Sequence, residues 1–385
     1  MRFITGGESH GPCLTAIIDG LPSGLAIDVR AINRDLSRRQ IGHGRGARMQ
    51  IETDRIEILG GVIAGRTIGA PVVLRIANRD WENWKGAWEA GDLPPVTVPR
   101  PGHADWSGMR KHGLNDARPI LERASARETA ARVAVGAVAR LLLCQFGVEV
   151  GGCVLRIAEH SAEESLLLNE RIDWPAIWAR AEKSPVRCAD PSASARMIEG
   201  IDRAVEVGES LGGIVCAAAI GVPIGLGSHA QWDRRLDARI AAAVLSIPAI
   251  KGVEIGPVFA NSSHSGTEVH DALRKDENGN VIHITNRAGG VEGGMSNGEP
   301  IVVRAAMKPI PTTVRPQDSV DVRTGELAQT SYERSDVCAV PTAAVVAEAM
   351  LAWVLAVALH DKIGGDSLAE MLAHQEAWRH RGEPT

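Results

Sequence analysis

The most membrane-like stretch of this chain runs from Ala339 to Leu359, and a stretch so apolar must be covered by something other than water. Pro341 and Glu348 interrupt it, and an ionisable residue in the middle of a bilayer span is costly. The stretch therefore predicts a buried helix at the centre of a folded domain. The N-terminal residues lack the apolar segment of a secretory signal, so we expect a cytoplasmic protein.

The composition fits a globular protein with an aliphatic core. Hydrophobic residues make up 44% of the 385 residues and charged residues 23%, which excludes disorder as the main state. Aromatic residues contribute only 3%, so the core must consist mostly of Ala, Val, Leu and Ile. The six cysteines form no CxxC pair, which favours free thiols in a reducing compartment. A net charge of −5 argues against a general nucleic-acid binder.

Hydrophobic periodicity indicates alternating helices and strands without a linker between them. Strands are expected at Leu14–Ile18, Arg55–Leu59, Val72–Ile76, 149–158, 213–221 and Ile301–Met307. Helices are expected at Arg30–Arg39, Ala126–Phe146, Trp174–Ala181, Leu236–Leu245 and Ala343–Leu359. Trp81–Pro101 shows no periodicity and is expected to be a long surface loop. One interlocked α/β unit follows from this pattern.

Two clusters near the N-terminus carry candidate chemistry. In GESHG (7–11), glycines allow a tight, exposed turn that presents Ser9 and His10, and a histidine there can act as a general acid. A histidine that only stabilises the turn is the alternative. Seven arginines and no lysine fall between Arg30 and Arg55, which favours bidentate capture of carboxylate or phosphate. A solvated basic face and RNA binding by the glycine–arginine loop 38–48 remain alternatives.

Three further clusters lie downstream. In Pro99–Asp105, two prolines stiffen Arg100 and a glycine turn precedes His103. Ser125 and Glu128 form a possible capping box, with cationic side chains beside it that suit an anion. Lys308 ends an apolar strand, and Ser335 or Asp336 is a possible N-cap of the last long helix.

The residues alone therefore indicate an enzyme that acts on a small, multiply anionic substrate with histidine as acid or base. HExxH, paired cysteines and clustered carboxylates are missing from the sequence, so we expect no metal. Walker A and GxGxxG loops are also missing.

Eight blocks in a fixed order give the chain a close resemblance to the chorismate synthase family. The blocks are GESHG (7–11), RRQIGHGRG (38–46), RPGHAD (100–105), ERASARETAARVAVGA (122–137), KGVEIG (251–256), GGVEGGMSNGEP (289–300), MKPIPT (307–312) and ERSDVCAVP (333–341). The resemblance implies an α/β (α+β) fold, a single-domain sandwich of antiparallel sheets and helices over 1–385. Residues 366–385 are expected to form a surface C-terminal tail.

The family implies a lyase that converts 5-enolpyruvylshikimate 3-phosphate to chorismate by 1,4-anti elimination of phosphate. This is the last step of the shikimate pathway, which leads to aromatic amino acids. The reaction requires reduced FMN without net redox change, and NADPH is a possible reductant. A homotetramer and an external flavin reductase are the implied partners, with no nucleic acid and no membrane.

The resemblance also assigns residue roles. His10 would protonate the departing phosphate, His103 would lie near the flavin N1 and O2 atoms, and Asp336 would work with flavin N5 in removing the substrate's C6 proton. The substrate would be bound by Ser9, Arg39, Arg45, Arg48, Arg100, Arg127 and Arg334. The flavin would be bound by Arg123, Ala124, Ser125, Pro248, Ala249, Gly293, Lys308, Pro309, Ile310, Pro311, Thr312 and Arg334.

Position 248 departs from the family, which more often has Asn or Gln there, and proline has no N–H to donate. The resemblance gives no role to His43 or to the Trp81–Trp88 segment. A flavin-independent phosphate lyase or phosphatase remains an alternative, with His10 as the acid and the arginines as a phosphate clamp.

Overall fold

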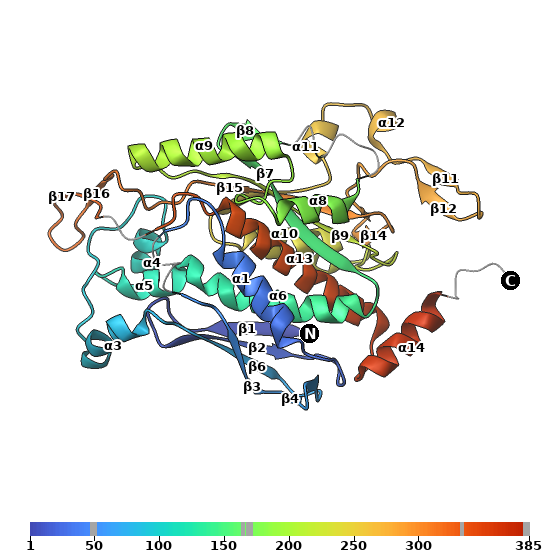
Figure 1. The fold of residues 1–385 in the computed structure, drawn as a ribbon, viewed down its shortest axis with the longest axis horizontal. Coiled ribbons are helices and arrows are strands. Elements are labelled where there is room, and N and C mark those ends of the chain that lie inside the picture. The colour runs from blue at the N-terminus through green and yellow to red at the C-terminus, as the bar shows by residue number, and fades with distance from the viewer. Residues whose placement is uncertain (47–51, 163–165, 167–171, 332–334, 380–385) are drawn as a thin grey trace.

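Two antiparallel sheets enclose a layer of helices in the computed structural model, which describes residues 1–46, 52–162, 166, 172–331 and 335–379 (Figure 1). The first sheet has the strand order β1-β2-β6-β3, formed by Arg2–Gly6, Cys13–Asp19, Val72–Ala77 and Ile56–Gly60. The second has the order β10-β15-β9-β7-β8, formed by Ile250–Ile255, Ile301–Met307, Gly213–Ile220, Glu149–Ile157 and His160–Ser161. The described ladders in both sheets are antiparallel.

The first sheet turns one face toward the helices. Alternate residues of β2 (Leu14, Ala16 and Ile18) are buried, whereas the residues between them are half-buried. This period of two is expected for a sheet that is covered on one face. In β7, by contrast, the residues from Val150 to Leu155 are all buried.

The helical layer consists of α1 (Val29–Gln40), α6 (Thr129–Cys144), α10 (Leu236–Leu245) and α13 (Val340–Ile363). Helix α13 packs on β7 and β9 of the second sheet, and α6 packs on β2 and β6 of the first. The two helices approach closely at Gly136, where a Cβ atom would lie 2.4 Å from the Cβ atom of Ala349. Small side chains therefore allow the two central helices to touch.

One carboxylate lies inside this apolar layer. Glu348 of α13 is 1% exposed, and both of its oxygens accept hydrogen bonds from Arg38 of α1, at 2.8 Å each. Arg140 of α6 also donates to Glu348. Burial favours the neutral acid, but the two guanidinium groups outweigh it and lower the pKa of Glu348 to about 2. The carboxylate thus joins three helices.

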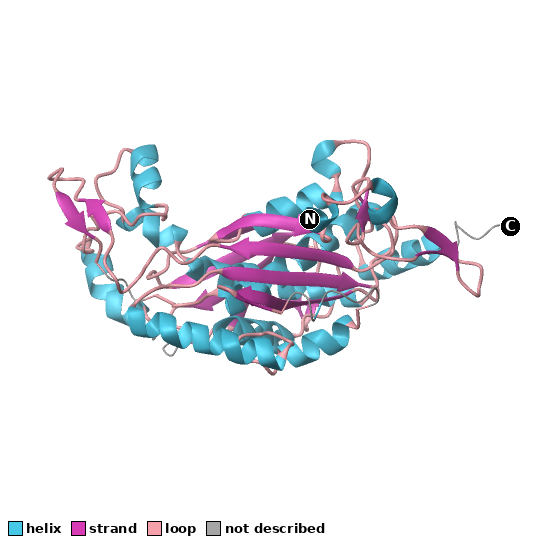
Figure 2. Ribbon diagram, turned by 90° about the horizontal axis from the view of Figure 1, so that it is seen from above, coloured by secondary structure: helices cyan, strands magenta, loops and turns pink. Residues whose placement is uncertain are grey.

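Smaller elements surround the sandwich. The helices are α3 (Trp81–Ala90), α4 (Asp105–His112), α5 (Arg118–Ala124), η1 (Ala126–Glu128), α8 (Trp174–Ala181), α9 (Pro191–Val207), η2 (Trp232–Arg234), α11 (Val258–Asn261), α12 (Gly266–Val269) and α14 (Leu368–Arg379). The short strands are β4 (Val62–Ile63), β5 (Arg66–Thr67), β11 (Leu273–Lys275), β12 (Val281–His283), β13 (Val291–Glu292), β14 (Met295–Ser296), β16 (Asp318–Val320) and β17 (Leu327–Gln329). The pairs β11–β12 and β16–β17 project at opposite ends of the molecule (Figure 2).

The α+β sandwich agrees with the expected fold class, and the expected strands and helices are present with shifts of a few residues at their ends. Helix α13 is long and apolar enough to span a membrane by length and composition, yet its apolar window is 100% buried. The burial prediction for this segment is confirmed. All six cysteines are free thiols, but Cys144 is exposed and Cys13 only half-buried.

Three local predictions are wrong. Trp81–Ala90 is a helix, α3, and not part of a loop. Ser125 caps the short η1 by accepting a hydrogen bond from the Arg127 N–H, while Glu128 binds other side chains, so no capping box forms. Helix α13 begins at Val340, beyond both Ser335 and Asp336, and neither residue is its N-cap.

Candidate active site

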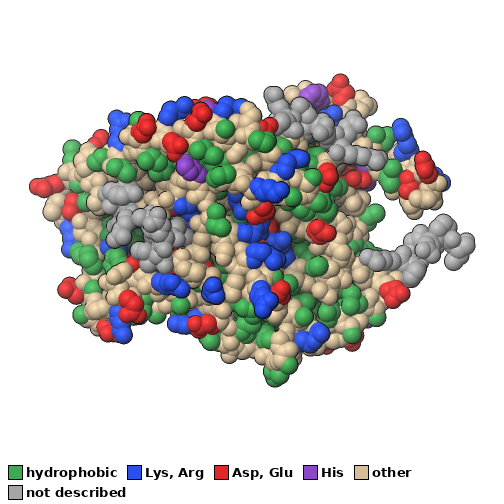
Figure 3. Space-filling model, in the orientation of Figure 1, with side chains coloured by type: hydrophobic (Ala, Val, Ile, Leu, Met, Phe, Trp, Pro, Cys, Tyr) green, Lys and Arg blue, Asp and Glu red, His purple; other side chains and the backbone are tan. Residues whose placement is uncertain are grey.

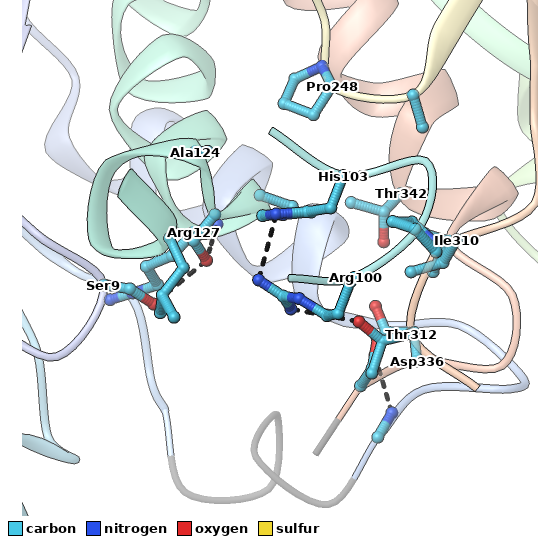
Figure 4. Close-up of a pocket in the computed structure, with 18 of the residues that line it drawn as sticks. Ser9, Arg100, His103, Ala124, Arg127, Pro248, Ile310, Thr312, Asp336 and Thr342 are labelled. Atoms are coloured by element: carbon cyan, nitrogen blue, oxygen red, sulfur yellow. Dashed lines mark hydrogen bonds between the residues drawn. The ribbon is translucent and has the colours of Figure 1, made fainter. Parts of the chain in front are cut away.

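A cavity of about 550 Å³ brings together segments that are far apart in the sequence (Figure 4). The lining residues come from the β1–β2 loop, the end of α1 and the loop after it, α3, the 100–104 loop, the α5–η1 junction and the segments 307–312 and 335–342. The predicted site residues that line it are Ser9, His10, Arg39, Arg45, Arg100, His103, Ala124, Ser125, Arg127, Pro248, Ala249, Lys308, Ile310, Pro311, Thr312 and Asp336. The cavity thus combines a cationic side with an apolar one.

His10 is held by a buried carboxylate. Its Nδ1 atom lies 2.8 Å from Glu122 Oε1, and its backbone N–H donates to Glu122 Oε2 at 2.8 Å. The neighbouring Ser9 hydroxyl donates to the Ser125 hydroxyl at 3.1 Å. Asn78 donates to three backbone carbonyls of the same loop. The glycine-flanked turn is therefore fixed from both sides, and its two polar side chains are aimed at the cavity.

Arg39 and Arg127 share one carboxylate. Asp54, which is 1% exposed, accepts from Arg39 Nη2 at 2.8 Å and from Arg127 Nη1 at 2.6 Å. Asn78 also accepts from Arg127 Nε at 2.9 Å, so it connects this arginine to the loop that carries His10. Burial alone would raise the pKa of Asp54, but the two guanidinium groups lower it below its usual value.

Arg45 pairs with the predicted proton acceptor. Its Nη1 atom donates to Asp336 Oδ2 at 2.5 Å, and the Gly46 N–H donates to Asp336 Oδ1 at 2.7 Å. Both carboxylate oxygens of Asp336 are therefore engaged by the loop that follows α1. A Cβ at Gly46 would lie 2.6 Å from the Ser335 carbonyl oxygen, so glycine permits this close approach.

Arg100 and His103 form a compact cluster around Asp105. Asp105 is fully buried; its Oδ2 accepts from Arg100 Nε at 2.8 Å and its Oδ1 lies 2.5 Å from His103 Nδ1. Arg100 Nη1 donates to the Thr312 hydroxyl at 3.2 Å. Figure 4 shows the Arg100 side chain between His103 and Thr312. Although burial opposes it, these hydrogen bonds keep the pKa of Asp105 well below its usual value.

The remaining predicted residues do not line the cavity or are not described. Arg123 points to the β1–β2 segment, where it donates to the carbonyl oxygens of Thr5 and Gly7. Gly293 sits in the turn between β13 and β14, and Pro309 is not among the lining residues. Arg48 and Arg334 lie outside the described residues. His43, for which no role is expected, contacts Asp202 at 2.6 Å.

The sequence analysis did not identify the carboxylates that pair with the histidines and arginines of the site, and it did not identify the aromatic ring of Trp84. Glu122, Asp54 and Asp105 hold His10, the Arg39–Arg127 pair and the Arg100–His103 pair, respectively. Trp84 of α3 lines the cavity and packs on His10, with 4.3 Å between ring centroids. Asp105 and Glu122 lay inside motifs that were singled out, but neither was given a role there. Asp54 lay in no motif, and its partners Arg39 and Arg127 are distant in the chain.

Comparison with known proteins gives matches over nearly the whole chain. The family model described as chorismate synthase matches residues 1–359. Chorismate synthases of Chlorobaculum tepidum and Brevibacillus brevis are 51% and 52% identical to the chain, each over 98% of both sequences.

The chain belongs to the chorismate synthase family.

A solved structure entitled "Crystal Structure of Chorismate Synthase" superposes with a TM-score of 0.81 at 42% identity, covering 98% of this chain and 97% of that one. The α+β sandwich is thus the fold of a chorismate synthase. Membership makes the chain an enzyme of class EC 4.2.3.5, a carbon–oxygen lyase acting on phosphates, at the final step of the shikimate pathway.

Proposed function

We propose that the cavity converts 5-enolpyruvylshikimate 3-phosphate to chorismate and inorganic phosphate by 1,4-anti elimination, with reduced FMN bound beside the substrate. The observation that carries this proposal is the meeting of four arginines, His10 and Lys308 in one cavity of about 550 Å³. A substrate with two carboxylates and a phosphate needs several cations in fixed positions. We place this reaction in the cytoplasm, as part of aromatic amino-acid biosynthesis.

The residues present fit a flavin mononucleotide. Pro248, Ala249, Ile310 and Pro311 supply an apolar surface for the ring system, and Lys308 supplies a cation near them. Pro248 offers only its ring and its carbonyl group, so the contact there would be apolar or to the carbonyl oxygen. Reduced FMN, when bound, supplies electron density that eases the departure of phosphate.

Buried arginine atoms also support an anionic ligand. Arg39 Nε and Arg45 Nε are buried without a hydrogen-bond partner among the described residues, and Arg127 Nη2 has only the Glu52 carboxylate, 3.5 Å away. Buried donors in native proteins are nearly always satisfied, and an anion in the cavity would satisfy these. Bidentate binding of carboxylate or phosphate by guanidinium groups would also orient the substrate.

His10 is the proposed donor of a proton to the departing phosphate. Glu122 engages Nδ1, so the proton is delivered from Nε2. A positioned general acid of this type contributes about 10²–10⁴-fold to a rate. His103 and Arg100, both held by Asp105, supply positive charge that balances the anionic cofactor.

Asp336 is the proposed acceptor of the proton from substrate C6. Without ligand, its carboxylate is bound to Arg45 and to the Gly46 N–H. A substrate carboxylate that takes over Arg45 would free Asp336 Oδ2 to accept the proton. Substrate binding would therefore prepare the proton acceptor.

The deciding experiment is anaerobic turnover of 5-enolpyruvylshikimate 3-phosphate with reduced FMN, with oxidised FMN, and with oxidised FMN plus NADPH. We expect equal amounts of chorismate and phosphate with reduced FMN and none with oxidised FMN. The NADPH arm separates self-reduction from supply by an external flavin reductase. Phosphate without chorismate, or turnover indifferent to flavin, would instead support the phosphatase alternative. Size measurement of the same protein tests the proposed homotetramer.

A further inference from the structure

We propose that Glu122 and Trp84 are positioning residues for His10: Glu122 holds the imidazole in the tautomer that delivers a proton from Nε2, and Trp84 covers one face of the ring. The inference deepens the proposed function, because it rests on His10 as the acid of the elimination. It gives a role to the tryptophan-rich segment for which the sequence suggested none.

Glu122 makes three contacts with the loop that carries His10. One carboxylate oxygen binds His10 Nδ1 and the other accepts from the His10 backbone N–H, both at 2.8 Å. The Glu122 backbone carbonyl accepts from the Ser9 N–H, also at 2.8 Å. A carboxylate that binds both the backbone and the ring of one residue fixes its position and its χ1 angle together. The side chain of Glu122 is only 4% exposed, so water competes little for these bonds.

Glu122 places a buried negative charge beside the imidazole. Burial opposes ionisation of this carboxyl, but hydrogen bonds from His10 and the charge of Arg118 lower its pKa below the usual value. Arg118 Nη1 lies 3.5 Å from Glu122 Oε1, on the preceding turn of α5. Glu122 is thus a buried anion between one permanent cation and one titratable ring. Asp80, which precedes α3 and lines the same cavity, is a further charged group on this side.

Trp84 packs against the histidine from α3. The two ring centroids are 4.3 Å apart with an interplanar angle of 39°. The Arg118 guanidinium lies over the same indole, 5.3 Å from its centroid. No residue of α3 is buried, so the contacts of Trp84 distinguish it from a core tryptophan. Trp84 is better explained as a cover over the imidazole, which limits its rotation and excludes water from one face.

The contact between the two rings also supplies a readout that needs no substrate. A protonated imidazole quenches the fluorescence of an adjacent indole more strongly than a neutral one. The emission of Trp84 should therefore report the charge of His10 in the ligand-free protein. Subtracting the emission of W84F from that of the unmodified chain isolates this signal from the other eight tryptophans.

The first experiment is a fluorescence titration of the ligand-free protein between pH 5 and 9. We expect a Trp84-dependent rise with pH that disappears in H10N. In E122Q its midpoint should move to lower pH, because the variant removes the negative charge that is hydrogen-bonded to the ring. E122D should recover part of the shift. W88F is the matched control, since Trp88 lies on the same helix but not in the cavity, and it should leave the midpoint unchanged.

Steady-state kinetics provide the second readout. E122Q should lower kcat about 10- to 100-fold with KM changed less than about 2-fold, because the acid is misplaced while the arginines are intact. W84F should lower kcat a few-fold, and W88F should not.

A midpoint that is identical in E122Q and the unmodified chain would overturn the role of Glu122. A Trp84-dependent rise that persists in H10N, or the lack of any difference between W84F and the unmodified chain, would overturn the contact between the rings. If the unmodified protein fails to form chorismate, the proposed function falls, yet the titration still decides the Glu122–His10–Trp84 arrangement.

Discussion

Replacing Glu348 by glutamine tests whether the carboxylate inside the helical layer stabilises the fold. The substitution keeps the size of the side chain and removes its charge, so Arg38 and Arg140 keep only Asp35 as a shared anion. Glutamine imitates the protonated acid, and the loss should equal the free energy by which folding favours the ionised form. The expected loss of unfolding free energy can therefore be calculated from the pKa of Glu348 in the folded protein.

The magnitude follows from the pKa of Glu348. Folding lowers it from the ordinary 4.5 to about 2, and each unit corresponds to about 1.4 kcal/mol, so ionisation contributes about 3 kcal/mol at pH 7. Removal of one partner from a buried ion pair typically costs about 3–5 kcal/mol, which agrees. Because the folded pKa is the lower one, this stabilisation is complete above the unfolded value and disappears as the pH falls toward 2. At pH 3 about 1 kcal/mol should remain.

Urea unfolding of both proteins at pH 7 and pH 3 provides the assay. The difference in unfolding free energy should shrink from about 3 to about 1 kcal/mol. Glu206→Gln is the control, because Glu206 is exposed on α9, and it should change stability by less than about 0.5 kcal/mol at either pH. A loss below 1 kcal/mol at pH 7, or a difference that does not depend on pH, would refute the reasoning.

Two further predictions concern the arginine pair and the helix contact. Asp54→Asn should raise KM for the substrate about 10-fold or more, since Arg39 and Arg127 lose their common anchor; an unchanged KM in steady-state assays would show that this anchor does not matter. Gly136→Ala should cost about 1–3 kcal/mol because its new Cβ meets α13 at 2.4 Å, whereas Gly86→Ala on α3, with nothing within 4 Å, should not destabilise the fold. Equal melting temperatures for the two glycine variants would contradict the close packing.

The sequence was a good guide to the elements whose pattern is local. The apolar composition of Ala339–Leu359 predicts the buried helix that the structure shows at 340–363, and the short run Leu14–Ile18 predicts the strand at 13–19. Helix α3 was missed although Trp81, Trp84 and Trp88 recur at helical spacing, because glycine and charged residues stand between them. These tryptophans are only half-buried, and they contact the cavity or one another.

The site residues also differ in whether a local sequence pattern identifies them. Histidines and arginines were recognisable because glycines and prolines flank them in short motifs. Their carboxylate partners were not, since Glu122 meets His10 across 112 positions and Asp54 meets Arg127 across 73. Such pairs exist only once the two sheets and the helices between them have assembled. The family resemblance supplied roles, but it did not supply these contacts.

Most cations of the cavity already have an anion in the absence of ligand, and the pairing of Arg45 with Asp336 is the clearest case. An incoming molecule must therefore exchange partners with the protein, and it cannot simply neutralise free charge. Chloride, sulfate or inorganic phosphate can replace one such partner at a time and gain little from doing so. A molecule that carries three anionic groups at the right spacing can replace several at once. If the proposed reaction takes place in this cavity, inorganic phosphate should therefore compete with the substrate only weakly.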